Sequence, residues 1–403
     1  MSIVDRAHAD ALDEADPLAA LRGQFEPGDP DTIYLDGNSL GRLPLASRKR
    51  LHELIDEWGE RLVAGWDDWL DVPRQVGDRL GSVALGAAPG QVLVCDSTTV
   101  NLYKLACAAL DGLSPRGASV LVTDTGNFPT DRYVLEGLAA ARGLRLRLVD
   151  GDPVHGPCAS DVLADDVALV VLSHVGYRTG AVADVPAVTA ACAAAGVPLL
   201  WDLSHSVGAL PVSLDADSVQ LAVGCTYKYL NAGPGAPAFL YVRRELQDRL
   251  RSPIQGWFGQ HDQFAMHRPY DPCPDIRRFL TGTPPVLQLA GVASAVELIA
   301  EAGIDRIRAK NLALTSYAVQ LYDSWLEPLV FRLGSPRDAA RRGSHVTLQH
   351  PAAEQLVREL IVRHRVVGDF RGPDCIRFGL AAPYTRFVDV HDGFARLRAL
   401  ADS

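Results

Sequence analysis

The sequence has no excess of positive charge and no long apolar run. Its 39 Lys and Arg residues are outnumbered by 49 Asp and Glu residues, which gives a formal net charge of −10. Nonspecific binding to nucleic acid or to anionic membranes needs a basic surface, so neither partner is expected. The first residues, MSIVDRAHADALDEADP, lack the apolar centre of a signal peptide, and no apolar run is long enough to cross a membrane. We therefore expect neither a signal peptide nor a transmembrane helix.

The cysteines also lack the spacing that would indicate a disulfide framework or a zinc site. The chain has seven cysteines, an odd number, and none are spaced as Cys-x-x-Cys. A secreted disulfide framework or a zinc site would require regular pairing, so we expect reduced thiols in a cytoplasmic protein and no metal.

What the sequence does contain is enough apolar material for a large core. Of its 403 residues 48% are hydrophobic, which suggests one large domain and a smaller one. Strand-like runs alternate with helical stretches rich in Ala and Leu, a pattern typical of a mostly parallel sheet covered on both faces. The predicted strands are residues 92–95, 119–123, 144–149, 167–172, 197–201, 221–223 and 236–242, and helices are predicted at residues 7–24 and 287–302.

A single lysine stands out in the stretch LAVGCTYKYLNAGPGAPAFL, which covers residues 221–240. Lys228 follows an apolar strand, lies between two tyrosines and precedes an Asn-Ala-Gly-Pro-Gly turn. Burial disfavours the ammonium form, and a neutral amine is a nucleophile whose natural partner is an aldehyde. The alternative is a lysine that reaches the surface from the end of a strand.

A carboxylate upstream favours the first interpretation. The strand VPLLWD ends in Asp202, and a polar turn with His205 follows. Ligands of α/β sheets bind beyond the carboxyl ends of the strands, where Asp202, His205 and Lys228 are all expected. Pyridoxal phosphate requires a lysine for its Schiff base and a carboxylate for its pyridine nitrogen, so this pair suits that cofactor.

Eight segments resemble the kynureninase family, in that family's order. They are YLDGNSLGRLP from Tyr34, DSTTVNLYKL from Asp96, NFPTDRY from Asn127, SHVGYRTG from Ser173, WDLSHSVGALPV from Trp201, GCTYKYLNAGPGAPAF from Gly224, GWFGQ from Gly256 and RRFLTGTPP from Arg277. The resemblance implies the α/β fold of fold type I pyridoxal-phosphate enzymes, with a mostly parallel seven-stranded sheet and a smaller α+β C-terminal domain. We expect an N-terminal segment at 1–65, a cofactor domain at 66–285 and a small domain at 286–403.

The resemblance also implies roles for particular residues. Lys228, Asp202 and Tyr227 match catalytic residues, and Ser39, Trp66 and Arg377 match substrate-binding residues, with Arg377 on the substrate carboxylate. The other matches to cofactor-binding residues are Thr98, Thr99, Phe128, Asp131, Ser173, His205, Trp257 and Thr283. Taken alone, Thr98 and Thr99 open a predicted helix, where capping is the commoner use of a hydroxyl. In the family Trp257 and Thr283 lie partly across a subunit boundary.

The implied activity is hydrolysis of L-kynurenine, and more weakly of 3-hydroxykynurenine, to anthranilate or 3-hydroxyanthranilate and L-alanine. This reaction belongs to tryptophan catabolism and NAD biosynthesis, and the family is expected to form homodimers with the active site at the subunit interface. Lysine and aspartate are shared by the whole superfamily, so a cysteine desulfurase or an aminotransferase is the alternative. A non-catalytic binding protein of the same fold is a second alternative, but it would be expected to lose Lys228 or Asp202.

Overall fold

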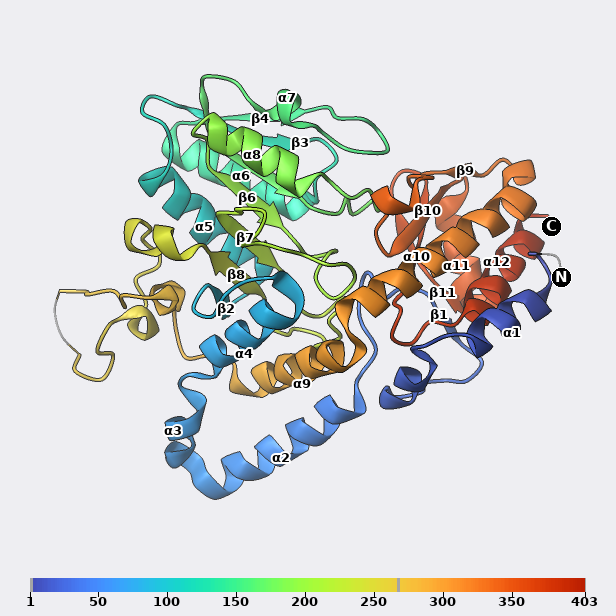
Figure 1. Cartoon of the computed structure of the whole chain (residues 1–403), viewed down its shortest axis with the longest axis horizontal. Coiled ribbons are helices and arrows are strands. Elements are labelled where there is room, and N and C mark those ends of the chain that lie inside the picture. The colour runs from blue at the N-terminus through green and yellow to red at the C-terminus, as the bar shows by residue number, and fades with distance from the viewer. Residues whose placement is uncertain (1–2, 267–268, 403) are drawn as a thin grey trace.

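The computed structural model describes residues 3–266 and 269–402 and divides into a large α/β part and a smaller C-terminal part (Figure 1). The N-terminal segment begins beside the C-terminal part. In Figure 1 its first helix lies beside the last helix of the chain, so the two ends of the sequence are neighbours.

The large part is built on a seven-stranded sheet. Its strands are β2 (Val92–Val94), β3 (Val120–Asp124), β4 (Arg145–Val149), β5 (Val167–Ser173), β6 (Leu199–Asp202), β7 (Leu221–Gly224) and β8 (Phe239–Val242). Their order across the sheet is β2-β8-β7-β6-β5-β3-β4, and β8 runs in the opposite direction to the other six strands of this sheet. The predicted fold class is therefore confirmed. Strand β8 begins later than expected, because the backbone N–H of Ala236 closes a turn onto the carbonyl of Gly233.

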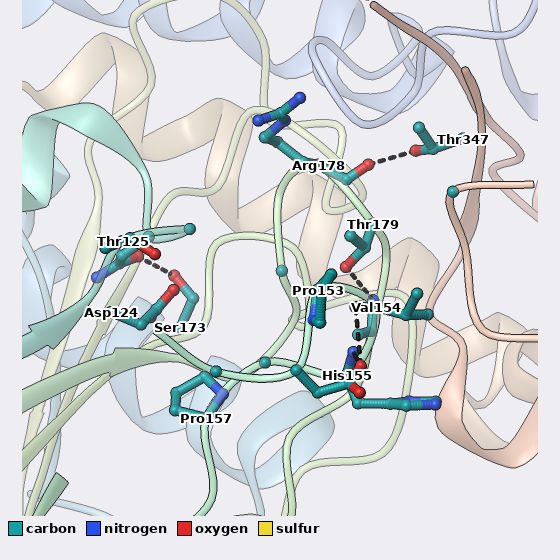
Figure 2. Close-up of a pocket in the computed structure, with 18 of the residues that line it drawn as sticks. Asp124, Thr125, Pro153, Val154, His155, Pro157, Ser173, Arg178, Thr179 and Thr347 are labelled. Atoms are coloured by element: carbon teal, nitrogen blue, oxygen red, sulfur yellow. Dashed lines mark hydrogen bonds between the residues drawn. The ribbon is translucent and has the colours of Figure 1, made fainter. Parts of the chain in front are cut away.

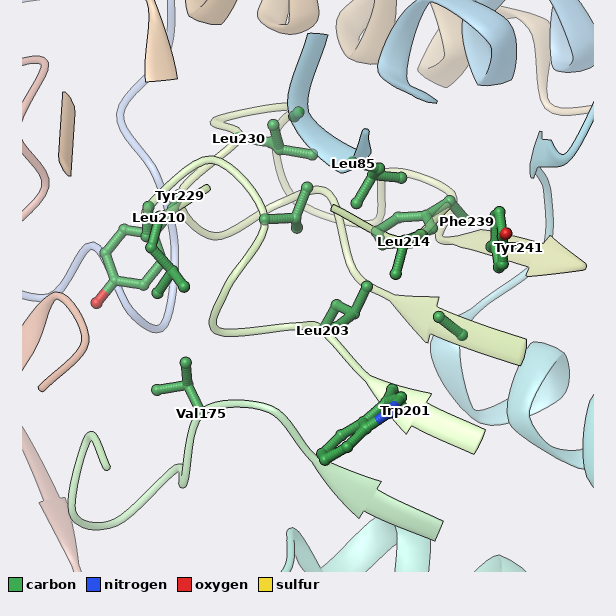
Figure 3. Close-up of a cluster of buried hydrophobic side chains, with 14 of the residues drawn as sticks. Leu85, Val175, Trp201, Leu203, Leu210, Leu214, Tyr229, Leu230, Phe239 and Tyr241 are labelled. Atoms are coloured by element: carbon green, nitrogen blue, oxygen red, sulfur yellow. The ribbon is translucent and has the colours of Figure 1, made fainter. Parts of the chain in front are cut away.

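Successive residues of the central strands point into two different cores. Trp201 packs with Leu203, Phe239 and Tyr241 on one face of the sheet (Figure 3), whereas Leu200 packs with Leu169 on the other. This alternation follows from the two-residue period of a strand. Helices cover both faces: α4 (Val72–Leu80), α5 (Thr98–Gly112), α6 (Pro129–Arg142), α7 (Ala159–Val162), α8 (Val185–Ala194) and α9 (Val286–Ala302).

The C-terminal part has a four-stranded antiparallel sheet of order β12-β13-β10-β9. Its strands are β9 (Arg332–Leu333), β10 (His345–Gln349), β12 (Asp369–Arg371) and β13 (Cys375–Gly379), and its helices are α10 (Ile304–Leu321), α11 (Ala353–His364) and α12 (Phe387–Ala401). The N-terminal segment adds β1 (Ile33–Tyr34), which pairs in parallel with β11 (Val366–Val367). The predicted division at residues 65 and 285 stays a prediction.

The helix predicted over residues 7–24 is wrong as a single element. It forms α1 (Arg6–Glu14) and a separate 3-10 turn at Ala19–Gln24. Pro17 cannot donate a backbone hydrogen bond, and Asp16 Oδ1 accepts instead from the N–H of Leu18 at 2.9 Å. Asp16 also pairs with the buried Lys310 at 2.6 Å, which fixes the break against α10.

Helix α2 (Leu45–Arg61) and the short α3 (Trp66–Trp69) also lie outside these layers, and α2 packs along α9. No single helix of the described residues is long and apolar enough to cross a membrane. The segments Val286–Ala302 and Ile304–Leu329 pass such a test only when joined across a 78° bend.

Candidate active site

The site begins at the carboxyl ends of β5, β6 and β7. Ser173 ends β5, Asp202 ends β6, and the turn after β7 carries Lys228. That turn is held by the N-terminal segment, because the N–H of Gly41 donates to the carbonyl of Tyr227 at 2.8 Å. A Cβ at Gly41 would lie 2.4 Å from the carbonyl oxygen of Lys228, so only glycine permits this approach.

The side chain of Lys228 is buried beside a histidine and an aromatic ring. Its Nζ lies 3.2 Å from His205 Nε2 and 5.7 Å from the centre of the Phe128 ring. Burial holds the pKa of His205 well below its usual range, and the neighbouring Lys228 lowers it further. His205 is therefore neutral near pH 7 and can accept a hydrogen bond from the lysine.

Two carboxyl groups, Asp202 and Asp131, lie together in the floor of the site. Asp202 Oδ1 accepts from the N–H and the hydroxyl of Ser204, at 2.8 and 2.6 Å. Burial raises the pKa of Asp202, and burial with the nearby Asp202 raises that of Asp131 well above its usual range. Asp131 Oδ2 is buried and has no hydrogen-bond partner among the described residues. An N–H cation placed here would satisfy both groups, since two adjacent carboxylates cannot both ionise without one.

Asn127 fixes the positions of Ser173 and Phe128 next to these groups. Its Oδ1 accepts from the Ser173 hydroxyl and from the N–H of Phe128, each at 2.7 Å. The Phe128 ring meets Tyr177 edge-on, with 5.3 Å between centroids. Phe128 therefore has a fixed orientation beside Lys228, which suits a ring that stacks on a flat ligand.

A cavity of about 380 Å³ lies next to Asn127, between the 151–157 loop and the turn after β5 (Figure 2). Ser173 and Arg178 line it, and the carbonyl of Arg178 accepts from the Thr347 hydroxyl. The Arg178 guanidinium lies 3.3 Å from Cys375 Sγ and 3.6 Å from Asp374. Arg178 is therefore held against the C-terminal part of the chain.

Arg377 is almost fully buried in β13 and forms the centre of a polar network. Its Nε and Nη2 donate to the two carboxylate oxygens of Asp369, the first at 2.7 Å, and its Nη1 donates to the carbonyl of Tyr177. Ser39 Oγ donates to Asp369 Oδ2 at 2.9 Å. Three of the five guanidinium donors are used, which leaves two for a bound carboxylate.

The N-terminus of α5 carries both predicted threonines. Ser97 accepts from the N–H of Val100 at 3.3 Å and so caps the helix. Thr98 is half-buried and Thr99 is exposed, and neither hydroxyl is needed for the cap. The free N–H groups of this first turn and the two hydroxyls make a suitable place for a phosphate.

Three predicted residues lie apart from this group. Trp66 packs on Trp69 and Phe258, with ring centroids 5.7 and 6.4 Å apart, while Trp257 is 42% exposed and Thr283 is exposed. In the described part of the chain none of the three has a hydrogen bond, ion pair or ring contact with Lys228 or Asp202. Their roles stay predictions.

Several residues of the site were not predicted from the sequence. Asp369 and His345 come from the C-terminal sheet, and the His345 ring lies 5.7 Å from that of His205. Burial lowers the pKa of His345 to about 3, so it is neutral as well. Neither residue stands in a motif that would have marked it. Ser204 and Asn127, by contrast, lie inside recognised segments.

No group of three or more His, Cys, Asp or Glu in the described residues is placed to hold a metal ion. The cysteines at 95, 107, 158, 192, 225, 273 and 375 are all free.

Comparison with solved structures defines the class to which this fold belongs. An apo cysteine desulfurase from Thermococcus onnurineus NA1 superposes with a TM-score of 0.82 at 19% identity, covering 95% of this chain and 98% of that chain. A structure of C-DES with glycine covalently linked to its pyridoxal phosphate cofactor also gives a TM-score of 0.82 at 19% identity, covering 94% and 98%. The fold is that of the fold type I pyridoxal-phosphate enzymes.

Sequence comparison narrows the class to a family. The family model described as "Kynureninase C-terminal domain" matches residues 307–397. The kynureninase of Burkholderia pseudomallei strain 1106a is 43% identical over 406 residues, covering 99% of this chain and 96% of that protein. The kynureninase of Pseudomonas fluorescens is 42% identical, covering 97% and 94%. The chain belongs to the kynureninase family, which confirms the resemblance found in its motifs.

Proposed function

We propose that this protein is a hydrolase that cleaves the Cβ–Cγ bond of L-kynurenine, giving anthranilate and L-alanine. The observation that carries the proposal is the 43% identity, over nearly its whole length, to proteins named kynureninase. Such a reaction would serve tryptophan catabolism or NAD biosynthesis. The seven free thiols are compatible with a cytoplasmic location.

Pyridoxal phosphate is the proposed cofactor, and the residues of the site fit it. Asp202 and the partnerless Asp131 Oδ2 form a buried acidic pair suited to a protonated pyridine nitrogen. Phe128 would stack on the ring, and Thr98, Thr99 and Tyr227 would hold the phosphate. His205 and Ser173 would lie at the ring edge. When bound, the cofactor supplies an electron sink for negative charge at the substrate Cα.

Lys228 and His205 would handle the proton at the substrate Cα. The Lys228 amine would be set free when the substrate amine takes its place, and it would then remove that proton as a general base. Neutral His205, 3.2 Å away, orients the amine without adding a competing positive charge. Asp202, held by two hydrogen bonds from Ser204, would keep the pyridine nitrogen charged throughout.

Tyr227 would serve as a proton donor late in the reaction. Burial, followed by the neighbouring Cys225, raises the pKa of its phenol, so the group stays protonated near neutral pH. Its ring centre lies 6.0 Å from Lys228 Nζ. A phenol at this position can exchange protons with groups near the lysine once water has attacked the γ-carbonyl.

Arg377 would bind the substrate carboxylate with its two remaining donors. Asp369 holds the guanidinium plane and Ser39 in turn binds Asp369, so the N-terminal segment takes part in positioning the clamp. A planar guanidinium in a fixed orientation gives a bidentate contact that a lysine could not reproduce.

We further propose a homodimer with the site at the subunit interface. Apolar side chains at the end of α2 and just beyond it are unusually open: Trp58 is 56%, Leu62 63% and Val63 79% exposed. Exposed apolar residues gathered in one place mark an interaction surface. Trp257 and Thr283, which are exposed here, would complete the phosphate end of the partner's site.

The alternatives are a cysteine desulfurase or an aminotransferase of the same fold, and a non-catalytic binding protein. The similarity to a desulfurase is one of fold at 19% identity and carries no argument about substrate. The test is incubation of the cofactor-loaded protein with L-kynurenine, L-cysteine and an amino acid with a 2-oxo acid acceptor. Anthranilate and alanine from the first substrate alone support the proposal. Sulfide, transamination or no turnover would refute it.

Preference between the two kynurenines is proposed to depend on Trp66. An apolar indole offers no hydrogen bond to a ring hydroxyl, and apolar pockets discriminate by about 1–3 kcal/mol, so kcat/KM should favour L-kynurenine over 3-hydroxykynurenine roughly ten- to a hundredfold. Trp66→His should reduce this preference. Equal values for the two substrates in the wild-type enzyme, or no change on substitution, would show that Trp66 only packs against Trp69 and Phe258.

A further inference from the structure

A second cavity, of about 460 Å³, lies between the N-terminal segment and the C-terminal helices and shares no lining residue with the candidate active site. Its lining includes the six arginines Arg22, Arg42, Arg363, Arg365, Arg386 and Arg396. They face the four aspartates Asp29, Asp31, Asp389 and Asp392. The cavity therefore has an excess of two positive charges, in a chain whose formal net charge is −10.

The aspartates do not neutralise this excess. Asp389 is shared by Arg22, at 3.2 Å, and Arg386, at 2.7 Å. Asp392 is turned to Arg6, at 3.1 Å, which does not line the cavity. Asp29 pairs with Arg365, and Arg363 pairs at 3.3 Å with Glu359, which does not line the cavity. Most of the acidic charge is thus already committed, and Asp389 serves two guanidinium groups.

Two of the arginines have no carboxylate partner among the described residues. Arg42 donates to the carbonyl of Pro27 at 2.8 Å, and its Nε is buried without a hydrogen-bond partner. The Arg42 guanidinium lies over the rings of Tyr34 and Tyr384, 5.6 and 5.4 Å from their centres. Arg396 donates to the carbonyl of His364 at 2.6 Å.

The positive charges in this cavity affect the pKa of Arg22. Burial lowers the pKa of this guanidinium, and the neighbouring Arg386 and Arg42 lower it further, against the opposing effect of Asp389. An arginine cluster that costs free energy in the folded protein would be stabilised by a bound anion.

We propose that this cavity is a binding site for a small molecule that carries a phosphate or diphosphate group. Guanidinium groups bind phosphate oxygens in pairs, and the cavity volume lies within the range of small-ligand sites. The groups come from the 3-10 turn before Phe25, the loop before α2, the end of α11, and the N-cap and body of α12. A bound anion would therefore join elements far apart in the sequence.

Occupancy of the cavity would also order part of the active site. Tyr34, which stacks on Arg42, donates from its hydroxyl to the carbonyl of Leu40 at 2.7 Å. The next residue, Gly41, donates to the carbonyl of Tyr227. An anion that fixes Arg42 would thus restrict the segment that supports the Lys228 turn.

The test uses the protein saturated with pyridoxal phosphate, so that the proposed phosphate end of the active site is filled, and pyrophosphate as the probe. Calorimetry should show one binding site per chain, and hydrogen–deuterium exchange should slow at residues 29–42. Arg22→Gln and Arg396→Gln should each weaken binding about tenfold. Arg358→Gln, whose side chain is 72% exposed on α11 outside the cavity, is the matched control and should bind as wild type.

Arg396→Gln keeps the test decisive if Arg22→Gln folds poorly, because Arg396 has no carboxylate partner to leave behind. No binding by the wild-type protein would overturn the proposal. Equal affinity in wild type and Arg396→Gln would overturn it too. Neither result depends on the reaction at Lys228.

Discussion

At the residue scale, the proposed role of Arg377 in binding the substrate carboxylate can be tested by a single substitution. It is buried, and Asp369 and Tyr177 occupy three of its donors. Arg377→Ala should chiefly raise KM for L-kynurenine, by about tenfold to a hundredfold, because it removes a charged hydrogen-bonding partner of the substrate carboxylate. Steady-state kinetics measures this. Arg178→Gln is the control, since Arg178 lines the neighbouring cavity and pairs with Asp374 instead of Asp369. An unchanged KM in the first variant and a raised KM in the second would move the clamp to Arg178.

Asp36 gives a pH dependence that can be assigned to one group. Burial, and then the nearby Asp369, raise its pKa to about 6. The folded protein therefore holds this proton more tightly than the unfolded chain does, and the protonated form favours folding. This contribution is complete below pH 4 and is lost as the pH rises towards 6.

Asp36→Asn keeps the side chain neutral at every pH. The free energy of unfolding of the wild type, relative to this variant, should fall between pH 4 and 6 and level off above that. Urea unfolding at several pH values provides the measurement. A difference that rises with pH, or stays flat, would contradict the raised pKa.

At the scale of elements, substitutions in the first turn of α5 distinguish helix capping from ligand binding. Thr98→Val should weaken pyridoxal phosphate binding roughly fivefold, since one neutral hydrogen bond contributes about 1 kcal/mol. Ser97→Ala, the matched control, should lower the free energy of unfolding by about 1 kcal/mol and leave cofactor affinity near wild type. Titration of the apo protein with cofactor, with urea unfolding of both variants, tests this. The reverse pattern would assign the phosphate contact to Ser97.

The elements of the large part could be predicted because each is marked locally. Buried apolar runs such as the one before Asp202 became strands, and the turn after each run placed its polar residues at one edge of the sheet. The break of the first helix at Pro17 was missed, since it depends partly on Asp16 pairing with Lys310 nearly three hundred residues away.

The C-terminal contribution to the site could not be predicted in the same way. Asp369, the partner that orients Arg377, lies in a short strand with no motif, and the buried His345 reaches the site only because β10 pairs with β13. Such contacts follow from the packing of the two parts of the molecule. No local pattern in the sequence encodes them.

At the scale of the whole molecule, the open apolar end of α2 predicts self-association. The protein should have twice the mass of one chain by light scattering after size-exclusion chromatography. Val63→Lys should shift it towards the monomer, because a charge would have to be buried in the interface. Val362→Lys is the matched control, since Val362 is also exposed, at 73%, but lies on α11. A monomeric wild type would contradict the proposed dimer.

The most direct test of the whole account is the appearance of anthranilate from L-kynurenine, followed by its fluorescence, in the cofactor-loaded wild type and in Lys228→Ala. The wild type should produce anthranilate and an equal amount of alanine. Lys228→Ala should be inactive while keeping the wild-type circular dichroism spectrum, because the buried amine beside His205 is the proposed base. Lys49→Ala, changed at an 80% exposed lysine, should be fully active. Near-normal turnover by Lys228→Ala, or no anthranilate from the wild type, would contradict the account.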